Sequence, residues 1–281
     1  IRLPAVFTAP SDVLAGLAVS VVAGATLQVG PAILLCLASA SIYCAGMAAN
    51  DLFDVAIDRQ ERPGRPIPSG RASVPAVWAL VLGLQLVGGG LAAWVGPVSA
   101  AAVLATVLLT YAYNALLKNG PLGPFAMGAC RYGNFLIGAS LCPWPFDSVV
   151  LLAPLGTLLY VVGLTWVSRH EVGEDGPPAA ALVQMLVCSL APAGLALAGL
   201  LPNAWGAALA LLTPLWLARP MLAVRRQPSG GATRGVVMAG IFGIAMVNGA
   251  LALAAGSVLF AAVSIGLLVP GRLVGRWFYA T

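Results

Sequence analysis

Long runs of apolar residues alternate with short polar stretches along the whole chain. Nine such runs lie at residues 12–29, 31–49, 74–95, 98–117, 121–141, 148–167, 179–200, 203–218 and 235–270. Uncharged stretches of about 18 residues or more are typical of helices that cross the hydrocarbon core of a bilayer. Pro and Gly, which favour turns, separate most of the runs. The pattern therefore predicts an all-α integral membrane protein.

The last run decides the expected number of helices. As one helix it would be about 54 Å long at 1.5 Å per residue, well beyond the roughly 30 Å of a hydrocarbon core. A break near Gly256-Ser257 gives ten spans, whereas one span followed by an interfacial helix gives nine. We expect a bundle of nine or ten transmembrane helices around a central lipid-accessible cavity, built as a single domain from residues 1–281.

The composition agrees with this fold class. Hydrophobic residues make up 60% of the chain and charged residues 8%, against about 25% charged residues in a soluble domain. The mean hydropathy is +0.96. No polar stretch is long enough to form a second globular domain. We expect the lipid bilayer as the surroundings of the protein and no nucleic acid as a partner.

The charged residues indicate an orientation. If residues 51–72 lie in the cytoplasm and each run crosses the membrane once, six further basic residues also lie inside: Lys118, Arg169, Arg219, Arg225, Arg226 and Arg234. The short loops on the opposite side contain Asp147 and no Lys or Arg. This is the positive-inside distribution. We therefore expect a multi-pass protein of the plasma (inner) membrane, with its charged face in the cytoplasm.

The longest polar stretch, Asn50 to Gly70, carries candidate chemistry. Its aspartates have the spacing i, i+3 and i+7, so on a continuous helix they point within about 60° of one another. They are Asp51, Asp54 and Asp58. Such carboxylates suit Mg²⁺, which binds a few carboxylates together with phosphate oxygens. We expect the helix to end near Arg62, because Pro63 and Pro66 follow, and the next loop to present Arg62 and Arg65. A solvated loop is the alternative.

A second acidic stretch lies on the same expected face of the membrane. Glu171 and Asp175 are spaced i, i+4, so on a helical turn they share a face. Seven of the nine acidic residues belong to these two stretches, and only Asp12 and Asp147 lie elsewhere. Two acidic sites on one face are typical of a clamp for a diphosphate. A solvated turn between two helices is the alternative interpretation.

Two further charged residues stand near or within the apolar runs. Arg131 lies in the fifth run, where an ionisable residue costs about 2.5–3.5 kcal/mol. We expect it to line the polar part of the cavity, with pairing to backbone carbonyls as the alternative. Asp12 follows Pro10-Ser11 at the start of the first run, and we expect it to cap that helix.

With these motifs in view, the sequence resembles the UbiA superfamily of intramembrane prenyltransferases. The first element of the resemblance is Asn50-Asp51-x-x-Asp54-x-x-x-Asp58. The others are Arg62, Arg65-Pro66 with Ser69-Gly70, and Tyr111-x-Tyr113-Asn114-x-x-Leu117-Lys118. The span pattern fits along nearly the whole chain.

The resemblance implies Mg²⁺-dependent transfer of a polyisoprenyl group from its diphosphate to a small acceptor. It implies metal ligands at Asn50, Asp51, Asp54, Asp58, Glu171 and Asp175, the acidic members of this set being catalytic. It implies diphosphate-binding roles for Asn50, Arg62, Arg65, Asn114, Lys118 and Arg131. The active site would open to the cytoplasmic face, and the prenyl tail would lie among the helices.

The second motif departs from the usual pattern of the superfamily. It reads Ser168-Arg169-His170-Glu171, and no lysine follows it. This form is similar to the EboC-type branch, so the acceptor is open between an aromatic compound and a polyol or cyclitol. A transporter or permease is the alternative from another class. A terpene cyclase or a binder of prenyl diphosphates would keep the same fold.

Overall fold

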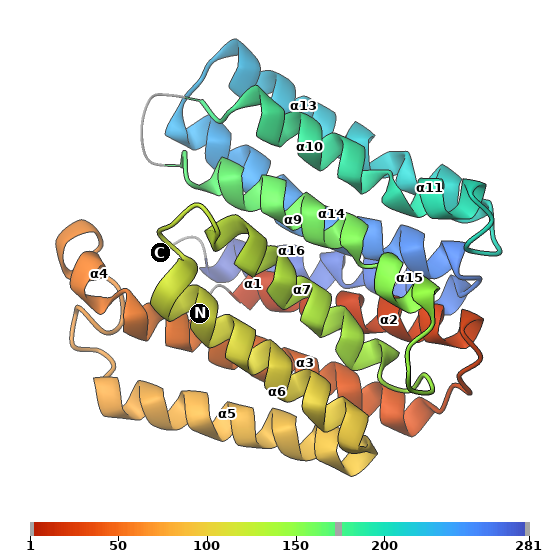
Figure 1. Cartoon of the computed structure of the whole chain (residues 1–281). Helices are drawn as coiled ribbons and strands as arrows, with labels where there is room; N and C mark the ends of the chain where they lie inside the picture. The colour runs from red at the N-terminus through yellow and green to blue at the C-terminus, as the bar shows by residue number, and fades with distance from the viewer. Residues whose placement is uncertain (1–2, 172–175, 279–281) are drawn as a thin grey trace.

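The computed structural model describes residues 3–171 and 176–278, and the regular structure within these ranges is helical (Figure 1). The amino-terminal helices are α1 (Leu3–Val6), α2 (Ala9–Val22), α3 (Val29–Phe53) and α4 (Val55–Glu61). They are followed by α5 (Val74–Val95), α6 (Pro97–Ala112), η1 (Tyr113–Leu117), α7 (Gly123–Ala139), α8 (Ser148–Leu152) and α9 (Leu155–Ser168). The remaining helices are α10 (Ala179–Ser189), α11 (Ala191–Leu197), α12 (Trp205–Ala210), α13 (Leu212–Arg226), α14 (Gly230–Ala254), α15 (Val258–Gly266) and α16 (Leu268–Phe278).

Seven of the described helical segments are long and apolar enough to cross a membrane, which makes this a multi-pass membrane protein. They are Val29–Phe53, Val74–Val95, Pro97–Leu117, Ser148–Ser168, Ala179–Leu197, Trp205–Arg226 and Gly230–Ala254. The shorter apolar helices Ala9–Val22 and Val258–Val274 lie beside them, as does α7. The last apolar run breaks near Gly256-Ser257, as expected, into α14 and α15. Gly256 has a φ of +91° at this break, a conformation that favours glycine. A total of nine or ten spans stays a prediction.

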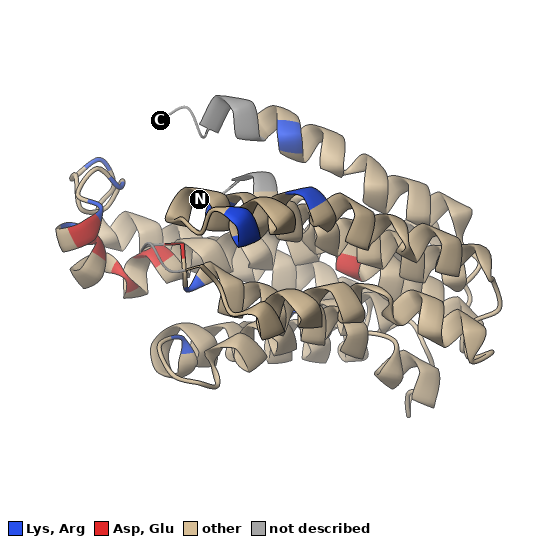
Figure 2. Ribbon diagram, turned by 90° about the horizontal axis from the view of Figure 1, so that it is seen from above, with Lys and Arg blue, Asp and Glu red and all other residues tan. Residues whose placement is uncertain are grey.

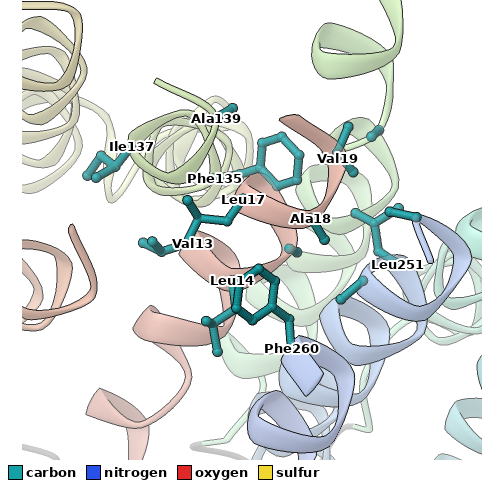
Figure 3. Close-up of a cluster of buried hydrophobic side chains, with 14 of the residues drawn as sticks. Val13, Leu14, Leu17, Ala18, Val19, Phe135, Ile137, Ala139, Leu251 and Phe260 are labelled. Atoms are coloured by element: carbon teal, nitrogen blue, oxygen red, sulfur yellow. The ribbon is translucent and has the colours of Figure 1, made fainter. Parts of the chain in front are cut away.

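The centre of the bundle is formed where α2 packs against α7, α14 and α15. Figure 3 shows Leu17 of α2 beside Phe135 of α7, and Leu14 of α2 beside Phe260 of α15, in one cluster of buried side chains. Glycine permits the close approach of two backbones here, since a Cβ on Gly138 would lie 2.0 Å from the carbonyl oxygen of Val13. Small residues at helix interfaces give membrane helices their close packing in the absence of a strong hydrophobic effect.

Charged residues gather at one end of the bundle (Figure 2). This end, which we call the charged end, comprises α4 with the loop 62–73, the turn 118–122, the described part of the α9–α10 loop, and the turn 227–229. The last two lie against each other, since a Cβ on Gly176 would be 3.1 Å from the side chain of Pro228. The turns of the opposite end include Gly96 and the segment 140–147. The described polar loops thus gather at one end of the bundle, as expected, and the side of the membrane on which this end lies stays a prediction.

Two hollows on the described surface are apolar. One, of about 250 Å³, lies among α6, α7 and α9. The other, of about 730 Å³, lies between α10 and the segment from Leu211 into α13. Neither is lined by the aspartates of α3 and α4, so the central cavity expected from the sequence stays a prediction.

Candidate active site

The first acidic motif lies where α3 passes into α4. Asp54 separates the two helices, but the hydrogen-bond ladder continues across it. The amide of Asp54 donates to the carbonyl of Asn50 at 3.0 Å, and that of Asp58 to the carbonyl of Asp54 at 2.8 Å. The second helix ends at Glu61, and Arg62 has non-helical backbone angles (φ −142°, ψ 60°). The predicted end of the helix before Pro63 is confirmed.

Each of the three aspartates contacts a basic side chain. Asp54 forms an ion pair with Lys118. Arg65 lies 2.5 Å from Asp58 and 3.4 Å from Asp51 through the same guanidinium nitrogen. Carboxylates crowded on two helical turns repel one another, and these basic groups offset the repulsion.

The loop after α4 turns Arg65 back onto the aspartates. The amide of Ser69 donates to the carbonyl of Arg65 at 2.9 Å, and the amide of Ala72 to that of Pro66 at 2.9 Å. Gly70 closes the loop with a φ of +76°, in the left-handed region that glycine tolerates. Arg62 is exposed beside this loop, and no ion pair joins it to another described residue.

A π-helical turn presents Lys118 and Asn114 to the first motif. The amide of Lys118 donates to the carbonyl of Tyr113 at 2.8 Å, the i to i−5 bond that defines η1. Such turns are frequent at functional sites. The amides of Asn114 and Asn50 are 2.7 Å apart. With the Asn50 amide in its better orientation, its oxygen accepts from Lys118 at 2.8 Å and its nitrogen donates to Asp54 at 3.2 Å.

Arg169 ties the second motif to this turn, and its role was not predicted from the sequence. Its guanidinium donates to the carbonyl oxygens of Lys118 at 2.8 Å and Gly120 at 2.7 Å. It also stacks over the ring of Trp166, 4.7 Å from the centroid. The Ser-Arg-x-Glu form of the motif was the available signal. The contact places Glu171, half-buried and two residues further on, in the same part of the charged end.

The second acidic partner, Asp175, lies outside the described residues, so its predicted role is not tested. Within the described part of the chain, no three acidic, His or Cys side chains are gathered closely enough to hold a metal ion. The oxygen ligands available here nevertheless suit Mg²⁺, which prefers carboxylate and amide oxygens. They belong to Asn50, Asp51, Asp54 and Asp58, which lie where α3 ends and α4 begins. Their roles as metal ligands stay a prediction.

Arg131 and Asp12 form a buried pair beneath the site. Arg131 donates to Asp12 at 3.0 Å, to Thr8 at 2.9 Å and to the hydroxyl of Tyr43 at 3.2 Å. The predicted capping role of Asp12 is wrong, because Thr8 occupies the cap position and the Asp12 side chain points into the bundle. The guanidinium of Arg131 is held by these partners, and its predicted contact with diphosphate is not tested.

Two asparagines complete the hydrogen bonding of the Asp12 carboxylate. Asn134 of α7 donates to it at 2.8 Å, and Asn248 of α14 donates to it at 2.6 Å. The oxygens of these two amides accept from Ser39 of α3 at 2.7 Å and Thr157 of α9 at 3.1 Å. The cluster thereby joins α2, α3, α7, α9 and α14 through fully paired polar groups. Buried polar groups are tolerated when they are paired in this way.

The fold and the site together define a class of protein: a membrane-embedded helical bundle with an acidic and basic cluster at one end. The model of the UbiA prenyltransferase family matches residues 13–234, and the chain belongs to this family. It is 38% identical over 141 residues to digeranylgeranylglyceryl phosphate synthase of Methanopyrus kandleri, covering 49% of this chain and 52% of that protein. It is 39% identical over 130 residues to chloroplast chlorophyll synthase of Arabidopsis thaliana, covering 40% and 31%.

The chain spans about half the length of the digeranylgeranylglyceryl phosphate synthases of Methanopyrus kandleri and Ignicoccus hospitalis that it matches. Two solved structures share the fold. One is from a study of digeranylgeranylglyceryl phosphate synthase in membranes (TM-score 0.61, 18% identity, covering 90% of this chain and 98% of that one). The other is a UbiA homologue from Archaeoglobus fulgidus bound to GPP and Mg²⁺ (TM-score 0.51, 12% identity, covering 95% and 96%).

Proposed function

We propose that this protein transfers a polyisoprenyl group from its diphosphate to a small acceptor within the membrane, in a reaction that depends on Mg²⁺. The main support is the chain of contacts at the charged end. Asp54 pairs with Lys118, whose carbonyl accepts from Arg169 of the second motif. Segments from three distant parts of the sequence thus meet at one polar site on an apolar bundle.

The arrangement suits the ionisation of an allylic diphosphate. Bound Mg²⁺ would neutralise charge on the diphosphate and favour cleavage of its C–O bond. Asn50, Asp51, Asp54 and Asp58 would hold the metal from α3 and α4, and Glu171 and Asp175 would hold it from the second motif.

The basic side chains would bind the diphosphate itself. Lys118 and Arg65, which pair with the aspartates here, carry charge that can turn to diphosphate oxygens once metal ions neutralise the carboxylates. Arg62 is exposed next to them, and Asn114 supplies an amide. Preorganised cations that stabilise a leaving group act on the transition state, where charge has developed, more than on the bound substrate.

The proposed site opens to the cytoplasmic face. The basic residues of the turns at the charged end support this orientation through the positive-inside rule. We expect the acceptor to be either an aromatic compound or a polyol or cyclitol. The names of the two relatives point to different products, so family membership leaves the acceptor open.

The test uses the full chain purified in detergent, with Mg²⁺, labelled geranylgeranyl diphosphate and a panel of acceptors. The panel contains a phenolic acid, a cyclitol and a prenylglyceryl phosphate. Diphosphate release together with a prenylated product is expected. A labelled hydrocarbon would instead indicate a terpene cyclase, and tight binding without turnover would indicate a binding protein. Absence of both binding and turnover would overturn the proposal and favour transport.

Variants separate the two acidic motifs in the same assay. Asp54→Ala and Asp175→Ala are each expected to abolish Mg²⁺-dependent turnover in a protein that still inserts and elutes as a folded species. Asp147→Ala is the control, because Asp147 is exposed at the opposite end, where it caps α8. Full activity in either of the first two variants would remove that motif from the proposed metal site.

A further inference from the structure

The larger apolar hollow is a groove on the outer side of the bundle. It lies between α10 and the segment from Leu211 through α13, and it has a volume of about 730 Å³. Of its eleven lining residues, ten are apolar and the other is Arg225. Ligand clefts in proteins commonly have volumes of about 300–1,000 Å³. The groove is therefore large enough to hold a bound molecule.

The apolar walls of the groove face outward. Val183, Leu215 and Leu222 are 56%, 70% and 56% exposed. Both flanking segments are membrane-spanning candidates, so these side chains meet lipid. Leu211 and Arg225 are separated by fourteen residues, which correspond to about 21 Å along a helix. One leaflet of the hydrocarbon core is about 15 Å thick. A single lipid chain can therefore lie along the groove.

Arg225 gives one end of the groove a positive charge. It lies in the last turn of α13, and the turn after that helix packs against the α9–α10 loop at the charged end. Ala179, the first residue of α10, lines the same end. No ion pair or hydrogen bond joins the Arg225 side chain to another residue in the described ranges. Its guanidinium is thus available to an anion at the membrane surface.

We propose that this groove binds one anionic glycerophospholipid, with an acyl chain between α10 and α13 and its phosphate paired with Arg225. The apolar walls select a lipid chain, and the arginine selects a negatively charged headgroup. Arg–phosphate pairs are charge-assisted and can be bidentate. The aspartates of α3 and α4 do not line the groove, and the proposal does not depend on the proposed enzymatic activity.

Native mass spectrometry of the full chain in detergent tests the proposal, with phosphatidylglycerol and phosphatidylcholine as the probes. One tight phosphatidylglycerol site is expected in the unmodified protein. Arg225→Gln is expected to weaken that site about fivefold, the effect of one basic residue near an anionic bilayer surface. Arg226→Gln is the matched control, because Arg226 is adjacent in sequence, equally charged and exposed, but does not line the groove.

A second pair of variants tests whether the acyl chain of the lipid lies in the groove. Ala218→Phe fills the groove and is expected to weaken phosphatidylglycerol binding, whereas Ala223→Phe lies on the same helix outside the groove and is expected to leave it unchanged. Equal losses in Arg225→Gln and Arg226→Gln would overturn the proposal in favour of diffuse surface charge. Binding of phosphatidylcholine as tight as that of phosphatidylglycerol would also overturn it, as would unchanged binding in Ala218→Phe.

Discussion

Replacing Asp12 tests whether the buried polar cluster stabilises the bundle. Asp12→Ala removes a carboxylate that accepts from Arg131, Asn134 and Asn248. Both asparagines keep a second acceptor, since Asn134 also donates to the carbonyl of Ala9 at 2.8 Å and Asn248 to Ser11 at 3.0 Å. The main cost is therefore the uncompensated charge of Arg131, about 3–5 kcal/mol.

This loss of stability can be measured as a decrease in the apparent melting temperature. At about 2–4 °C per kcal/mol for a large domain, Asp12→Ala should lower the apparent Tm by about 10 °C, measured by the fraction that still elutes as folded protein after heating in detergent. Asp147→Ala is the control, because it removes only an exposed cap of α8, worth about 1 kcal/mol. The double variant Asp12→Ala/Arg131→Met should recover part of the lost stability, because no buried charge is left unpaired.

Two results would refute this reasoning. An Asp12→Ala protein as stable as Asp147→Ala would mean that the buried pair contributes little to stability. A double variant that loses the full sum of the effects of Asp12→Ala and Arg131→Met, each measured alone, would mean that the charges are not coupled, since contacting residues are expected to deviate from additivity by about 0.5–3 kcal/mol.

Three further changes test other contacts. Gly138→Ala should destabilise the bundle by about 1–3 kcal/mol, because its Cβ would collide with the α2 backbone, whereas Gly83→Ala, with open space around it, should be neutral or slightly stabilising in the same heating assay. Arg169→Leu should lower prenyl transfer at least tenfold by freeing the second motif from the carbonyl of Lys118, and unchanged kcat would contradict this. Lys118→Met should raise KM for prenyl diphosphate if the lysine binds the diphosphate, and an unaltered KM in steady-state kinetics would exclude that role.

The elements of the fold were readable from local sequence. Apolar runs gave the helices, Pro63 ended the helix after the aspartates, and Gly256 marked the break in the last run. Each of these features depends on residues within a few positions of one another. Hydrophobic periodicity and turn residues act over that range, so a single sequence suffices to find them.

The pairing of distant side chains was harder to predict. Asp12 and Arg131 are separated by 119 positions, and nothing near Asp12 indicates that its partner is in α7 rather than in its own first turn. Pro10-Ser11 before it favours a cap, and that local signal was misleading. Arg169 was visible as part of a motif, but its bond to the carbonyl of Lys118 depends on how α7 and α9 pack. Such contacts depend on tertiary structure.

Exposure separates the charges that stabilise the bundle from those that can meet a ligand. The side chains of Asp12 and Arg131 are 1% and 8% exposed, and each forms three hydrogen bonds to neighbouring side chains. Those of Asp54 and Lys118 are 18% and 25% exposed. Partly hydrated ion pairs exchange partners at little cost, whereas breaking a buried pair costs several kcal/mol. In the reaction that we propose, a diphosphate with its metal would displace Lys118 from Asp54, while the buried pair of Asp12 and Arg131 would keep α2 and α7 in place during the exchange.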